Sequence, residues 1–143
     1  MKRPVYLSLG SNLGDRAANI ARAVELLDER FQTPHARLSG LYETAADGFE
    51  GPDFLNAAVR YDLTLAPLDI LRICKAVEEQ MGRPQHGIEL DGEGRRIYRS
   101  RLIDIDILLI GDEKVQTPEL TVPHPRMKDR EFVMVPLGEI LGI

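Results

Sequence analysis

The run from Leu102 to Ile110 constrains the fold most, because an apolar strand pattern there carries two aspartates, Asp104 and Asp106, at alternate positions. In an extended strand, residues two apart project from the same face, roughly 7 Å apart along the backbone. The continuous apolar stretch from Ile107 to Ile110 is typical of a strand that is covered on both sides. Two carboxylates at the start of such a strand repel each other unless a cation lies between them.

This pair favours a divalent metal site. Carboxylate oxygens on a rigid strand suit Mg²⁺, and five arginines are close in sequence: Arg83, Arg95, Arg96, Arg99 and Arg101. Metal ions and guanidinium groups together bind phosphate chains. The alternative is a chance Asp-x-Asp on the wet face of a half-exposed strand. The apolar stretch that follows favours the metal site, so phosphoryl-group transfer is the first functional hypothesis.

Size, composition and charge narrow the class of protein. A chain of 143 residues fits one domain, 1–143, and 43% hydrophobic with 29% charged residues is ordinary for a globular protein. No apolar stretch approaches the ~18 residues of a membrane span, and no signal segment begins the chain, so we expect a cytoplasmic protein. The net charge of −5 argues against a nucleic-acid surface. The single cysteine, Cys74, is expected to be a core residue.

Hydrophobic periodicity and turn residues give the order of elements. The sequence predicts strands over Val5–Leu9, Leu38–Thr44, Phe54–Leu63 and Leu102–Ile110, and helices over Arg16–Arg30 and from Pro67 to the break at Gly82. This order predicts an α+β sandwich with a ferredoxin-like βαββαβ core. In such a fold both helices cover one face of an antiparallel sheet, and the other face with its loops is free for ligands. Residues 84–100 show no periodicity and are expected to form a functional loop or a disordered segment.

The glycines and histidines carry weaker signals. Gly10 and Gly14 are not followed by the lysine of a phosphate-binding loop, and a tight strand-to-helix turn accounts for them. His35, His86 and His124 lack zinc-site spacing. His124 lies between two prolines, where a phosphate or ribose contact and a structural role are both open.

Two phenylalanines and an asparagine suit a flat heterocycle. Phe54 and Phe132 are core candidates by residue type, but aromatic side chains beside loops also stack on flat rings. Asn56 has the donor and acceptor pattern that reads an amide-like ring edge.

Five segments, in this order, resemble a known enzyme family. They are Gly10–Asp15, Phe54–Val59, Glu78 with Gly82 and Arg83, Arg101–Leu109, and Leu120–Met127 continuing to Arg130 and Phe132. Together they resemble the 6-hydroxymethyl-7,8-dihydropterin pyrophosphokinases (2-amino-4-hydroxy-6-hydroxymethyldihydropteridine diphosphokinases) over nearly the whole chain.

The resemblance implies a reaction and its catalytic residues. Such an enzyme transfers pyrophosphate from ATP, its co-substrate, to the hydroxymethyl group of a reduced pterin and releases AMP, as a step in folate biosynthesis. It implies that Asp104 and Asp106 bind two Mg²⁺ ions and face the substrate hydroxyl. It also implies that Arg83 and Arg101 steady the phosphate chain during transfer.

The resemblance further implies which residues bind the two substrates. It also implies that the protein is a monomer and that its partners are small molecules, without nucleic acid or membrane. For the pterin, Phe54 and Phe132 would stack on its faces, and its edge would meet Asn56 and the residues Thr44, Ala45 and Asp47. For ATP, the implied residues are Leu71, Lys75, Glu78, Arg83, Arg99, Arg101, Ile107, Thr121, His124 and Arg130, with Glu78 supporting the site from behind.

The sequence departs from the family pattern in three places. Tyr98–Ser100 replaces a tryptophan-glycine-proline, Ala45–Asp47 replaces a customary proline, and Pro125 stands where an aromatic residue often follows the histidine.

Rival functions differ from this one in their products. A nucleotide-cyclising or nucleotidyl-transferring enzyme of similar fold would release free pyrophosphate rather than AMP. A non-catalytic ligand-sensing module, or an inactive member of the family, would turn over neither substrate.

Overall fold

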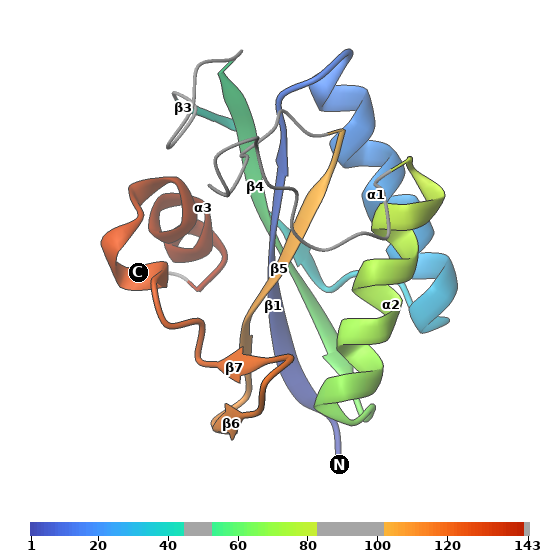
Figure 1. Ribbon diagram of the computed structural model, residues 1–143, viewed down its shortest axis with the longest axis vertical. Coiled ribbons are helices and arrows are strands. Elements are labelled where there is room, and N and C mark those ends of the chain that lie inside the picture. Colours follow the sequence, from blue (N-terminus) through green and yellow to red (C-terminus); the bar gives the residue numbers. More distant parts are fainter. Residues whose placement is uncertain (45–52, 83–101, 142–143) are drawn as a thin grey trace, which may run out of the picture.

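The structure is a computed structural model that describes residues 1–44, 53–82 and 102–141. Two helices, α1 (Arg16–Phe31) and α2 (Pro67–Gln80), lie on one face of a central sheet, and α3 (Glu131–Leu141) lies on the other (Figure 1). The remaining elements are β1 (Arg3–Ser11), β2 (Arg37–Leu38), β3 (Tyr42–Thr44), β4 (Phe54–Leu63), β5 (Asp104–Ile110), β6 (Val115–Gln116), β7 (Thr121–Val122) and the 3₁₀ turn η1 (Met127–Asp129).

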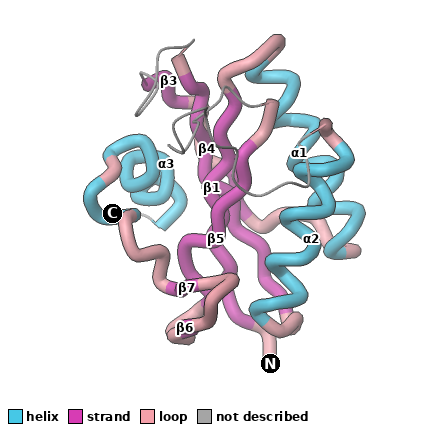
Figure 2. The backbone as a smooth tube through the Cα atoms, in the orientation of Figure 1, coloured by secondary structure: helices cyan, strands magenta, loops and turns pink. Residues whose placement is uncertain are grey.

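The main sheet is antiparallel and has the strand order β2-β4-β1-β5, with β3 pairing alongside β4. Figure 2 shows its strands as one layer between the helices. β1 is therefore central, and the strands before and after α2 flank it. This order confirms the predicted α+β, ferredoxin-like core.

Local sequence explains the two helices on the first face. The side chain of Asp15 caps α1 by accepting a hydrogen bond from the Ala18 N–H at 3.0 Å. Pro67 occupies the first turn of α2, where its missing N–H costs nothing. Gly82 follows α2 with φ of +106°, a conformation that favours glycine. Both helices bury their apolar faces, including Ile20, Leu27 and Val77, in a hydrophobic core between the helices and the sheet, called here the first core.

The prediction of one continuous strand over Leu38–Thr44 was wrong, because the segment forms two short strands, β2 and β3. β2 and β3 both pair with β4, and the chain between them breaks at Ser39. The Ser39 N–H donates to the Ala58 carbonyl at 2.9 Å, but the Ala58 N–H donates to the Ser39 hydroxyl at 2.8 Å. A side-chain oxygen thus takes the place of a ladder carbonyl, which interrupts the strand.

The second face of the sheet is not free along its whole length, which corrects the prediction that it was left to ligands. Side chains of α3, among them Leu137 and Ile140, pack on Tyr6, Ala58 and Leu108 in a second core. The β6-β7 hairpin, also not predicted, precedes α3. Ligands are therefore restricted to the part of this face beyond α3.

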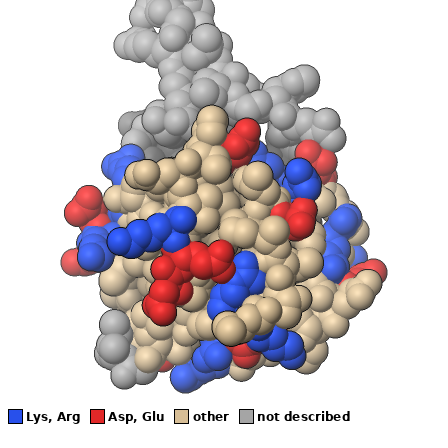
Figure 3. All heavy atoms as spheres, turned by 90° about the horizontal axis from the view of Figure 1, so that it is seen from below, with Lys and Arg blue, Asp and Glu red and all other residues tan. Residues whose placement is uncertain are grey.

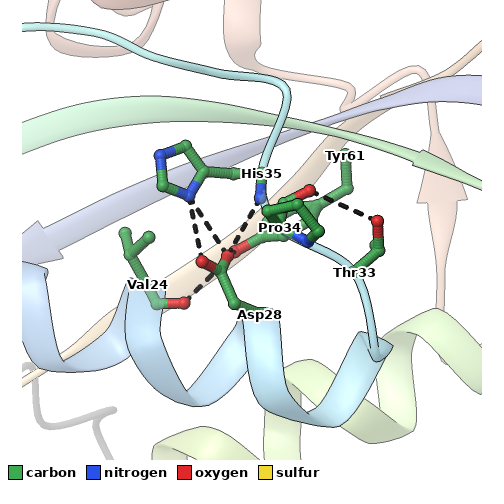
Figure 4. Close-up of polar contacts among 6 residues, drawn as sticks. All are labelled: Val24, Asp28, Thr33, Pro34, His35 and Tyr61. Carbon is green, nitrogen blue, oxygen red and sulfur yellow. Dashed lines mark hydrogen bonds and ion pairs between the residues drawn. The ribbon is translucent and has the colours of Figure 1, made fainter.

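A partly buried polar cluster fastens α1 to β4 (Figure 4). The fully buried Tyr61 hydroxyl donates to Asp28 at 2.6 Å, and the His35 backbone N–H and Nδ1 both lie 3.2 Å from the same carboxylate. Burial and the bond to Asp28 raise the pKa of Tyr61, so the phenol stays protonated. His35 therefore belongs to a structural cluster at the end of α1.

The described residues contain no helix that is both long and apolar enough to cross a membrane. Figure 3 views the molecule from the end where β1 begins, and acidic and basic side chains are interspersed there. That face therefore offers no broad field of one sign to a polyanion.

Candidate active site

Asp104 and Asp106 share one face of β5, as the spacing predicts. Ile105 and Ile107 point into the core beneath α1 and α2, while Leu108 joins the second core on the α3 face. The two aspartates alternate with the isoleucines and are half-buried. Both carboxylates therefore project from the face that α3 covers only in part.

The sheet register places Gly10 between the carboxylates and Asn56. Gly10 of β1 is opposite Asp104 on one side and opposite Asn56 of β4 on the other. Two strand spacings of ~4.8 Å separate the backbones of Asp104 and Asn56 by roughly 10 Å. A Cβ at Gly10 would lie 3.4 Å from both Asn56 Oδ1 and the Phe54 ring. The glycine hydrogen therefore leaves space on the sheet that a side chain would fill.

Asn56 is fixed in orientation and is only 3% exposed. Its Nδ2 donates to the Tyr42 carbonyl at 3.1 Å and to Thr44 Oγ1 at 2.9 Å. Because a carbonyl only accepts, the amide nitrogen must face β3, and Oδ1 faces Gly10. The structure thus brings together Asn56 and Thr44, two of the residues predicted for the pterin. Ala45 and Asp47 lie outside the described residues.

Phe54 and Phe132 are both half-buried. Phe54 begins β4 and lies against Gly10. Phe132 packs on the edge of the second core, and the Arg130 guanidinium carbon lies 5.5 Å from its ring centroid, a cation–π distance. Neither ring is fully enclosed by core residues, so both keep surface with which to contact a ligand.

His124 is tied to β5 and is electrically neutral at pH 7. The backbone N–H of His124 donates to the Leu108 carbonyl at 3.0 Å. The ring Nδ1 accepts from the backbone N–H of Arg126 at 3.3 Å, which leaves the ring proton on Nε2. Burial lowers its pKa, and the charges of Arg130 and Arg126 lower it further, against an opposing contribution from Asp104. His124 therefore presents one N–H donor close to the field of Asp104.

The Arg130 guanidinium has a buried N–H donor, at Nε, that suits an anionic acceptor. Within the described residues, its Nε is buried and has no hydrogen-bond acceptor. A buried donor without a partner costs about 1–3 kcal/mol, and more for a charged group. A phosphate oxygen would satisfy it and neutralise the guanidinium.

Glu78 supports β5 from the opposite side of the strand. It is 7% exposed, and its Oε2 accepts a hydrogen bond from the Ile105 N–H at 2.8 Å. Ile105 lies between Asp104 and Asp106, so this bond holds the backbone that spaces the two carboxylates. The charges of Glu78 and Asp106 also add to burial in raising the pKa of the Cys74 thiol.

Replacing Glu78 by alanine should reduce both stability and turnover. The Ile105 N–H would stay buried without its acceptor, which costs about 1–3 kcal/mol of unfolding free energy. Glu78→Gln should retain most of both, because its amide oxygen still accepts this bond. Urea denaturation and kcat for the two variants test this, and equal stability of Glu78→Ala and the wild type would contradict it.

The other predicted ATP residues are spread over several elements. Leu71 packs against the first core, Lys75 is exposed on α2, and Thr121 lies on β7. The Ile107 side chain is in the first core, so it does not share the face of Asp104 and Asp106. These assignments stay predictions. Three arginines, Arg83, Arg99 and Arg101, lie outside the described residues.

Sequence reasoning missed that β1 supplies the middle of the site. Ser8 is 7% exposed, and it is opposite both Asp106 and Ala58, one step along from Gly10. The signal was present, because Ser8 and Gly10 alternate with large apolar residues of the first core.

The donor set on β5 fits Mg²⁺. Proteins commonly hold this ion through one or two carboxylates, together with water and substrate phosphates. Asp104 and Asp106 would be those carboxylates, and Arg130 with His124 would meet phosphate oxygens from the side of α3. Together these groups could neutralise a polyphosphate beside the Asn56 amide, whose oxygen suits a flat ring with an amide-like edge.

The chain is similar to known proteins over nearly its whole length. The family model described as 7,8-dihydro-6-hydroxymethylpterin-pyrophosphokinase (HPPK) matches residues 6–142. The 2-amino-4-hydroxy-6-hydroxymethyldihydropteridine pyrophosphokinase of Porphyromonas gingivalis is 47% identical over 138 residues, which cover 95% of this chain and 89% of that protein. The Bacillus subtilis protein of the same name is 38% identical over 141 residues, covering 98% and 79%.

A solved structure shows the same fold. The crystal structure of Plasmodium falciparum HPPK-DHPS with pteroate has a TM-score of 0.70 at 17% identity, over 96% of this chain and 38% of that chain. This chain thus spans well under half of that longer structure. The family model matches most of this chain, and the two relatives are 47% and 38% identical and are covered to 89% and 79% of their length, so the chain belongs to the HPPK family.

Proposed function

We propose that this chain transfers diphosphate from ATP to 6-hydroxymethyl-7,8-dihydropterin in the presence of Mg²⁺, and that it acts in folate biosynthesis. The observation that carries the proposal is the row Asp104, Gly10 and Asn56 across three neighbouring strands. It puts a carboxylate pair suited to Mg²⁺ and an amide suited to a pterin edge on the same face, with only a glycine between them.

The pterin end of the site orients the acceptor. Thr44 and the Tyr42 carbonyl hold Asn56 so that Oδ1 accepts from the N–H groups of the pterin edge. Phe54 and Phe132 stack on the ring. The hydroxymethyl group then points across Gly10 towards Asp104 and Asp106.

The ATP end of the site neutralises the phosphate chain. Asp104 and Asp106 would hold two Mg²⁺ ions, and these would offset charge on the phosphate oxygens. Arg130 and the Nε2–H of His124 donate to further oxygens, and Arg83 and Arg101 steady the chain during transfer. The pterin hydroxymethyl oxygen forms a bond to the β-phosphorus and loses its proton. The bond from that phosphorus to the oxygen bridging the α-phosphate breaks, and AMP leaves with the oxygen.

We also propose the setting in which the chain acts. Residues 1–143 act as one pyrophosphokinase domain, as a monomer in the cytoplasm, on small molecules and not on nucleic acid. The net charge of −5 supports the last point. Light scattering of the purified chain measures the oligomeric state.

The decisive experiment follows AMP. The purified chain with ATP and Mg²⁺ should make AMP only when hydroxymethyl dihydropterin is added, and EDTA should stop it. Free pyrophosphate without pterin would instead indicate nucleotide cyclisation or nucleotidyl transfer. Pterin and ATP binding without any product would indicate a non-catalytic module.

A further inference from the structure

β3 is a short strand that orients the Asn56 side chain. It has three residues, Tyr42–Thr44, and the described part of its ladder is with β4 alone. Nevertheless, the Tyr42 carbonyl and the Thr44 hydroxyl are the two groups that orient Asn56. So short an edge strand is expected to fray unless other contacts hold it.

Arg16 holds one end of β3 from the helix layer. Arg16 begins α1, and its Nη1 donates to the Asp53 carbonyl at 2.9 Å, while its Nη2 lies 3.4 Å from Glu43 Oε2. Glu43 lies within β3, and Asp53 immediately precedes Phe54. One guanidinium thus joins the end of β3 to the start of β4, where Thr44 and Phe54 are paired.

Glu139 holds the other end from the opposite layer. Its carboxylate, on α3, accepts from the Gly40 N–H at 3.0 and 3.2 Å and from the Tyr42 hydroxyl. The bond from Tyr42 to Glu139 raises the pKa of that phenol, so Tyr42 stays protonated and remains a donor. Glu139 thus fixes the chain where it enters β3.

We propose that Arg16 and Glu139, called here the β3 clamp, are positioning residues that preform the pterin-binding side of the site. They reach β3 from opposite faces of the sheet and fasten its two ends, which keeps Thr44 and Tyr42 in register with Asn56. Neither contacts the ligand in this arrangement. The inference rests on the proposed function, because it assigns the pterin to Asn56.

The test compares Arg16→Met and Glu139→Met with Arg22→Met. Arg22 is exposed on the same helix α1 as Arg16 and pairs only with Glu25 in the described structure, so Arg22→Met removes the same positive charge as Arg16→Met without touching β3. Each clamp variant should raise KM for the pterin about five- to tenfold, and kcat at saturating pterin and KM for ATP should change less than about twofold. Arg22→Met should resemble the wild type.

Conservative variants separate positioning from general damage. Glu139→Gln should recover much of the pterin affinity, since its amide oxygen still accepts from the Gly40 N–H. Arg16→Lys should not, because an ammonium lacks the fork that reaches two acceptors. Unchanged pterin KM in both clamp variants, or an equal rise in KM for both substrates, would overturn the proposal.

Calorimetric binding of the pterin keeps this inference distinct from the proposed reaction. A wild-type chain that binds pterin but makes no AMP would refute the reaction, and the clamp would then be judged on the affinities of the variants. Weaker pterin binding by Arg16→Met and Glu139→Met, but not by Arg22→Met, is the result expected. A wild-type chain that binds no pterin would overturn both.

Discussion

Replacing Asp104 or Asp106 by asparagine should lower kcat by about a thousandfold or more. A bound metal ion contributes several kcal/mol of charge stabilisation to the transition state, and each ~1.4 kcal/mol is tenfold in rate. Asparagine keeps the size of the side chain and removes the charge that holds the ion. AMP formation at saturating ATP, pterin and Mg²⁺ measures the effect, and calorimetric Mg²⁺ titration in the presence of ATP measures the site.

The fold should survive these substitutions. Without Mg²⁺ the melting temperature should be unchanged or slightly higher, because one of two repelling carboxylates is gone. Asp112→Asn is the matched control, since Asp112 is exposed in the turn after β5 and undergoes the same change of charge. Retention of more than about a tenth of wild-type kcat by either site variant would show that the phosphate chain is held elsewhere.

Replacing Phe54 or Phe132 by alanine should weaken pterin binding roughly ten- to hundredfold. Stacking of a base on an aromatic side chain contributes on the order of 1–3 kcal/mol, and a pterin offers a similar flat surface. ATP affinity should change little in Phe54→Ala, because the proposed phosphate-binding groups lie over β5 and near η1. In Phe132→Ala it should fall less than the pterin affinity, because the ring that is lost contacts Arg130 among those groups. Calorimetry with each ligand separately provides the measurement.

Phe31→Leu gives the contrast for that experiment. Phe31 is a core residue whose ring centroid lies 4.9 Å from that of Tyr61, on the helix side of the sheet. Its replacement should lower stability and leave pterin affinity unchanged relative to ATP. Equal losses of both ligands in Phe54→Ala and Phe132→Ala would mean that these rings serve packing alone.

Much of the fold was predictable where a local pattern repeats. The bounds of β4 follow from its alternation, and the N-cap residue Asp15 and the first-turn residue Pro67 locate the helix starts. Helix α3 was not predicted, because its sequence is apolar on most sides and contains Pro136, which disfavours an isolated helix. Its burial against the sheet outweighs that local cost, and burial of this kind is not visible in a local pattern.

The site was predictable residue by residue but not as an arrangement. The alternation of Asp104 and Asp106 fixes their common face. That Gly10 separates Asp104 from Asn56 depends on the register of three strands that are distant in sequence. Similarly, nothing around Glu139 indicates that it accepts from Gly40, 99 residues earlier in the chain.

The burial of Cys74 provides a probe of motion. It is the one cysteine of the chain, it is fully buried on α2, and burial raises the pKa of its thiol. A thiol in this state reacts with labelling reagents only when the helix separates from the sheet. Glu78 lies one turn further along α2, so the labelling rate would report how often the support of β5 is withdrawn. Comparing that rate with and without bound substrates would show whether ligand binding on one face of the sheet makes α2 separate from the other face less often.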